Sequence, residues 1–146
     1  MSKEQLELEI PNLKQSDYKI TSDEDIFYNC IAWAAGDNSR CWWPDKGNCG
    51  YWPPDIRRET SLEAFVEAFK TLGYSVCNSA DYEVGIEKIA LYTKSGGIPT
   101  HAARQVYSHR WTSKAGQLED IEHKLEDIQG SVYGTVAIYM KRPLLA

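Results

Sequence analysis

Cys30 and His101 are the two residues whose types and positions are typical of a nucleophile and its base. Cys30 follows Asn29, a good helix N-cap, so the cysteine is expected in the first turn of a helix. The free N–H groups and dipole of a helix start stabilise a thiolate, and the same groups can hold the oxyanion of a tetrahedral intermediate. His101 opens a predicted strand after a glycine-rich turn, where it can accept the thiol proton. The sequence therefore predicts a Cys–His pair.

A third side chain usually orients such a base by accepting its second ring N–H. The expected place is the strand after that of His101, which contains no Asp, Glu or Asn. Ser113 is therefore the predicted orienting residue, with a backbone carbonyl or a water as alternatives. His123 is interpreted as a packed structural histidine, with a role as a further catalytic partner as the alternative. His109 is expected in an exposed hairpin turn.

An aromatic loop follows the Cys-bearing helix in the sequence. In the structural interpretation it is a stiff lid over a small core, because bulky aromatic side chains mainly supply buried area. In the functional interpretation it walls the substrate groove beside the oxyanion site. The residues predicted for that groove are Asn29, Trp42, Trp43 and Trp52.

The chain contains four cysteines. In an apolar helix, Cys30 has the alternative role of a small core hydrophobe. Cys41 and Cys49 lie in the turn-rich aromatic loop, but their spacing fits no common zinc pattern, and Cys77 ends a predicted strand. Without an export signal, cysteines are expected to be free thiols. We predict no metal site and no cofactor.

The elements that position these residues begin with the Cys-bearing helix, which Gly36 is expected to end. A capping box at Thr60–Glu63 predicts a second helix, with apolar residues at helical spacing through Leu72. A third helix is predicted over about 118–128. Residues 1–20 are expected to form an arm, or an edge strand around Leu6, Leu8 and Ile10 that Pro11 ends. Short β-like runs occupy the rest of the chain, at 74–77, 88–93, 100–107, 111–114 and 133–141.

Helices followed by a meander of antiparallel strands predict an α+β domain, with the Cys-bearing helix packed on an antiparallel sheet. The length of 146 residues suits one hydrophobic core. We therefore expect an N-terminal arm over 1–20 and a single domain over 21–146.

Composition narrows the function classes. A hydrophobic fraction of 42% and a charged fraction of 25% are typical of a folded domain. A net charge of −5 argues against general nucleic-acid binding and against an anionic membrane surface. The apolar runs are too short to span a bilayer, and the N-terminus has no apolar segment like that of a signal peptide. The expectation is a cytoplasmic protein.

Several motifs occur along the chain: Tyr28-Asn-Cys-Ile-Ala-Trp-Ala-Ala-Gly-Asp37, Trp42-Trp-Pro44, Tyr51-Trp-Pro53, Thr100-His-Ala-Ala-Arg104, Trp111-Thr-Ser-Lys-Ala-Gly116, Ile121-Glu-His123 and Tyr133-Gly134. Together they resemble a widespread bacterial family of small proteins without an established activity. In that resemblance Cys41 stands where a further Trp is expected, which makes a metal or disulfide role for it less fitting. The Asn-Cys helix and the later His strand are similar to the core of papain-like peptidases and amidases, so the resemblance implies a papain-like core.

The predicted function is a papain-like thiol hydrolase: a peptidase, deamidase or amidase acting on a peptide or amide substrate. Cys30 would attack the carbonyl, and His101 would carry the proton to the leaving amine. One alternative is a non-catalytic binding or regulatory module on the same fold, such as an inhibitor, an immunity protein or a pseudoenzyme with a protein partner. The other is an acyltransferase that forms a thioester.

Overall fold

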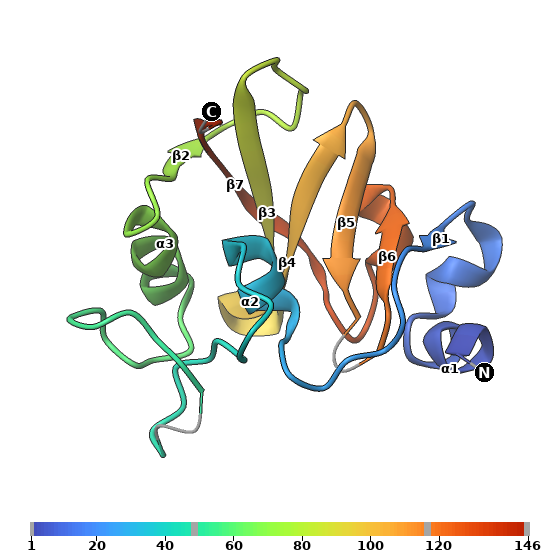
Figure 1. Ribbon diagram of the computed structural model, residues 1–146, viewed down its shortest axis with the longest axis horizontal. Coiled ribbons are helices and arrows are strands. Elements are labelled where there is room, and N and C mark those ends of the chain that lie inside the picture. The colour runs from blue at the N-terminus through green and yellow to red at the C-terminus, as the bar shows by residue number, and fades with distance from the viewer. Residues whose placement is uncertain (1, 48–49, 116–117, 145–146) are drawn as a thin grey trace.

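The computed structural model describes residues 2–47, 50–115 and 118–144, and it is built around one antiparallel sheet (Figure 1). The sheet has seven strands in the order β1-β6-β5-β4-β3-β7-β2. This arrangement confirms the α+β class. The strands are β1 (Lys19–Ile20), β2 (Ser75–Cys77), β3 (Ile86–Lys94), β4 (Ile98–Tyr107), β5 (Arg110–Lys114), β6 (Asp120–His123) and β7 (Thr135–Pro143).

Short helices cover the sheet. The α-helices are α1 (Ser2–Glu9), α2 (Cys30–Ala35) and α3 (Leu62–Lys70), and the 3-10 turns are η1 (Pro11–Gln15), η2 (Ser95–Gly97) and η3 (Leu125–Ile128). In Figure 1, α2 lies in front of the sheet with α3 to its left and α1 at the far right, and α2 contacts β4 and β5. Within the described part of the chain, no helix is long and apolar enough to cross a membrane.

Two hydrophobic clusters lie on opposite faces of the sheet, because successive side chains of a strand point to opposite sides. We call them the α2 face and the α1 face after the helix that packs on each. On the α2 face, Ala102 packs with α2 and with Phe65 and Phe69 of α3. On the α1 face, Ala103 packs with residues of α1 and η1. Adjacent residues of β4 therefore belong to different environments.

The local signals for α2 and α3 are confirmed. Asn29 caps α2 by accepting the Ala32 N–H, so Cys30 is its first residue, and Gly36 follows with a left-handed φ of 87°. Ser61 caps α3 by accepting the Ala64 N–H, which moves the cap one residue beyond the predicted Thr60. Short polar caps and apolar spacing are local signals, and here tertiary packing agrees with them.

Two predicted elements are wrong. Residues 2–9 are helical and form no edge strand, because Leu6 packs with Ile10 and Leu13 in the buried cluster of the α1 face. The predicted third helix over 118–128 is a strand followed by a 3-10 turn. Ile121 and His123 are both buried, and a spacing of two between buried residues is typical of a strand. β6 also pairs with β5 along its whole length.

Candidate functional site

Cys30 is buried at the start of α2. Its side chain packs in the cluster of the α2 face, and its thiol lies 4.0 Å from the Thr100 carbonyl oxygen. Burial raises the pKa of the Cys30 thiol to about 11, although the Ala102 backbone N–H and the Lys114 charge act to lower it. The helix start is present as predicted, but burial outweighs it. The thiol is therefore protonated at neutral pH and contacts the backbone of β4.

His101 points into the α1 face. Its ring stacks on Tyr133 with centroids 4.1 Å apart and meets Tyr92 edge to face at 5.5 Å. The residue is fully buried, and neither ring nitrogen has a hydrogen-bond partner, so it forms no hydrogen bond with the Cys30 thiol. Burial and the nearby His123 hold the pKa of His101 well below its usual value. The predicted Cys–His pair is not assembled in this structure.

Ser113 has a different partner from the predicted one. Its hydroxyl lies 2.7 Å from Nε2 of His123, whose Nδ1 lies 2.7 Å from the Lys124 carbonyl oxygen. Nδ1 must donate to that carbonyl, so Nε2 accepts the Ser113 O–H in the neutral ring. Burial lowers the pKa of His123 to about 4. Its ring is a satisfied, neutral link between β5 and β6, as the structural interpretation of His123 predicted.

The predicted groove residues hold the aromatic loop together. The Asn29 amide binds both backbone groups of Trp42, accepting its N–H at 3.0 Å and donating to its carbonyl at 2.8 Å. Trp43 and Trp52 each pack against Phe65, with centroids 5.4 and 5.1 Å away. These contacts fit the structural interpretation of the loop as a cover over the core.

A buried polar cluster ties α2 to the β5–β6 hairpin. Lys114 donates to the Leu118 carbonyl, and its ammonium lies 5.1 Å from the centroid of Tyr28. The Tyr28 hydroxyl donates to Asp120 at 2.9 Å, and burial is the main cause that raises its pKa to about 12. Burial also lowers the pKa of Lys114. These buried side chains contact one another, so none of them is an accessible acid or base.

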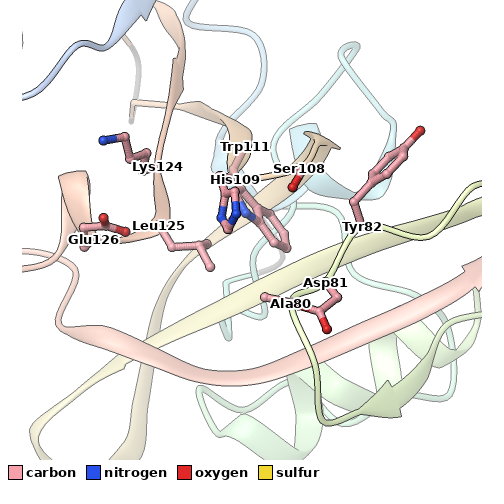
Figure 2. Close-up of a pocket in the computed structure, with 9 residues that line it drawn as sticks. All are labelled: Ala80, Asp81, Tyr82, Ser108, His109, Trp111, Lys124, Leu125 and Glu126. Carbon is pink, nitrogen blue, oxygen red and sulfur yellow. The ribbon is translucent and has the colours of Figure 1, made fainter.

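An open cleft lies on the α1 face, on the other side of the sheet from the cluster that contains Cys30 (Figure 2). It has a volume of about 580 Å³ and is enclosed by the loop after β2, the β4–β5 turn and the start of η3. Figure 2 has Trp111, His109 and Leu125 in the middle, with Lys124 and Glu126 on one side. The remaining lining residues are Ala80, Asp81, Tyr82 and Ser108.

Buried contacts fix the walls of this cleft. Gln105 of β4 donates to the Ala80 carbonyl at 2.7 Å, and the Tyr92 hydroxyl donates to the Leu125 carbonyl at 2.7 Å. His109 adopts a left-handed φ of 60° in the turn, as its predicted hairpin position requires. The cleft thus combines an apolar centre with donors and acceptors of both charge signs on its rim.

Sequence reasoning missed this cleft. Its lining comes from three segments that are far apart in the chain, and no motif spacing links them. The hairpin turn that carries His109 is the available signal in the sequence, and by itself it predicts only an exposed turn. Among the described residues, no group of three or more His, Cys, Asp or Glu could hold a metal. Cys30, Cys41 and Cys77 are free thiols, and Cys49 lies outside the described residues.

The model of a family described as a domain of unknown function (DUF7689) matches residues 19–141. No curated protein and no solved structure matches the chain. The papain-like core therefore stays a prediction.

Proposed function

Because the chain belongs to the DUF7689 family, whose description names no activity, we propose its function from its own geometry: a non-catalytic binding module that holds a peptide segment of a partner protein. The cleft of the α1 face carries this proposal. A papain-like origin of the Cys-bearing helix and sheet is part of the same hypothesis, in which the module is a pseudoenzyme on that core.

The chemistry of the cleft suits a peptide. Its volume of about 580 Å³ lies within the range of known ligand sites. Asp81 and Glu126 accept hydrogen bonds, Lys124 donates them, and Ser108 does both. A peptide offers backbone donors and acceptors side by side, together with apolar side chains for the Trp111 and Leu125 surface. A small molecule with a single charge would meet repulsion from one of the walls.

The state of Cys30 supports binding over hydrolysis. A thiol hydrolase needs a thiolate or a base that removes the thiol proton. The pKa of Cys30 is raised to about 11 by burial, and its polar contact is a backbone carbonyl. The imidazole of His101 is directed to the other face, where it stacks on Tyr133. A Cys30 thioester, whether for hydrolysis or acyl transfer, has no support from these contacts.

Peptide selection tests the proposal. A random peptide library displayed on phage is panned on the wild-type chain, and the selected peptides are synthesised for titration. The cleft variant is Asp81→Ala with Lys124→Ala, which removes one exposed charge of each sign and keeps the net charge. We expect selected peptides to bind this variant about tenfold more weakly, because charge-assisted hydrogen bonds are lost.

A matched control is Glu63→Ala with Lys70→Ala, which removes one exposed charge of each sign from α3. This control should bind the selected peptides as the wild type does. Selection of no peptide, or equal binding by the cleft variant and the control, would refute a peptide site in this cleft.

A further inference from the structure

The loop between η3 and β7 is fastened to the sheet by residues of two motifs that the proposed function does not use. Tyr133 stacks on His101, and the Thr100 hydroxyl donates to the Tyr133 carbonyl. Gly130 and Gly134 exchange two backbone hydrogen bonds of 3.1 and 2.7 Å, which close the loop. His101 thus acts as a flat platform for Tyr133, which explains a buried ring without hydrogen bonds.

Gly134 allows this loop to approach β3. A Cβ at this position would overlap the Thr93 carbonyl, and the φ of 77° is in the left-handed region that favours glycine. Only glycine therefore brings residues 130–135 against the end of β3. The Tyr133-Gly134 pair therefore sets both the contact of the loop with the sheet and its close distance.

The end of β3 is irregular at the same point. Its pairing with β4 shifts register between Tyr92 and Thr93, and its pairing with β7 shifts between Leu91 and Tyr92. Such bulges bend a strand away from its partners. Next to them lies an open cavity of about 560 Å³. It is lined by Thr93, Lys94, Ser95, Gly130, Ser131, Gly134 and Thr135.

The lining of this cavity differs from that of the peptide cleft. It has one cation, Lys94, and the hydroxyls of Thr93, Ser95, Ser131 and Thr135, but no carboxylate. No hydrogen bond or ion pair to another described residue engages these five side chains. The chain as a whole carries a net charge of −5, so a cavity without an acidic side chain is a local exception.

We propose that this cavity binds a phosphate group, as inorganic phosphate or as a small phosphomonoester. A phosphate offers oxygen acceptors that match the Lys94 ammonium and the surrounding hydroxyls. The phosphate site is separate from the peptide cleft and does not depend on it. Tyr133 and His101 are positioning residues, since they hold the Ser131 side of the cavity against β3 and touch no ligand.

Titration with inorganic phosphate tests the site. Backbone amide shifts of the ¹⁵N-labelled chain are followed at pH 7.5, with sodium chloride adjusted to keep the ionic strength constant. We expect saturable shifts at residues 93–95 and 130–135. Lys94→Gln should weaken binding about tenfold, because the charge-assisted contact is lost. Lys14→Gln, which removes an exposed lysine from η1, should leave it unchanged.

Two further experiments examine the stacking of His101 on Tyr133 and the source of the phosphate. His101→Phe keeps the stacking surface and should keep phosphate binding, whereas His101→Ala should weaken it. Glycerol phosphate binding more tightly than inorganic phosphate identifies a phosphomonoester site, and the reverse identifies a free-phosphate site. Absence of local shifts, or equal binding by Lys94→Gln and the wild type, overturns the proposal while leaving the peptide cleft unaffected.

Discussion

The two faces of the sheet are covered to different extents. On the α2 face, helices α2 and α3 and the aromatic loop cover the strands, so Cys30 and Phe69 are buried in one apolar cluster. On the α1 face, α1 and the 3-10 turns leave part of the sheet uncovered, and the cleft around Trp111 opens there. The α2 face, which contains Cys30, is closed to solvent. The accessible polar side chains line the cleft of the α1 face.

A reactive residue type needs both a catalytic partner and access to substrate. Cys30 has the helix start that favours a thiolate, but burial outweighs it. His101 has no hydrogen bond and contributes an aromatic surface, while His123 has two polar partners and stays neutral. Cys30, His101 and His123 are part of the packing, and the two open cavities are lined by residues from turns together with a few strand residues.

The largest expected effect concerns the core of the α2 face. Phe69 is fully buried against Tyr74 and the sheet, so Phe69→Ala should lower the free energy of unfolding by about 3–5 kcal/mol. Urea unfolding measures the loss. Val84→Ala, at a side chain that is 89% exposed, is the control and should change it little. A loss near zero at Phe69 would mean that this face is open to solvent.

Acidification should weaken the α1 face. The pKa of His123 is lowered to about 4 by burial, so the unfolded chain binds the extra proton first as the pH falls. Stability from this residue is complete above pH 6.5 and is lost toward pH 4, by about 3 kcal/mol. The pKa of His101 is also lowered by burial, so this residue adds to the loss of stability at low pH.

Comparing the wild type with His123→Gln isolates the contribution of His123 to the pH dependence of the free energy of unfolding, because both chains share all other titrating groups. Unfolding by urea at several pH values between 7 and 4 gives the measurement. If the free energy of unfolding depended on pH in the same way for the two chains, His123 would not be held neutral by the fold.

Thiol labelling contrasts the two faces directly. With a pKa near 11, Cys30 should carry about 100-fold less thiolate than an ordinary cysteine, and burial should slow it further. Iodoacetamide at pH 7.5, followed by mass spectrometry of the peptides, should label the partly exposed Cys41 and Cys77 first. Faster labelling of Cys30 in the folded chain would revive the nucleophile hypothesis.

The smallest expected effect is at His101. Its two ring nitrogens are buried without partners, and a buried unsatisfied polar group is destabilising. His101→Phe keeps the stacking on Tyr133 and should raise the free energy of unfolding at pH 7 by about 1 kcal/mol. Thermal or urea unfolding gives the value. A marked loss would indicate a hydrogen bond that the described contacts do not contain.

Local signals predicted much of the framework. The Asn29 cap with Gly36 predicted α2, the capping-box region predicted α3, and short β-like runs predicted β3, β4 and β5. These signals act over a few residues, which the sequence contains in full. The error at 118–128 arose because apolar residues three and four apart also fit a strand followed by a turn.

Local sequence signals were enough to predict the α+β class, the start of α2 at Cys30 and the strand that carries His101. Contacts between distant segments set the stacking of His101 on Tyr133, the hydrogen bond between Ser113 and His123, and the enclosure of the cleft by three segments. The physical reason is that strand register and bulges, which depend on pairing across the whole sheet, choose the face to which each side chain points.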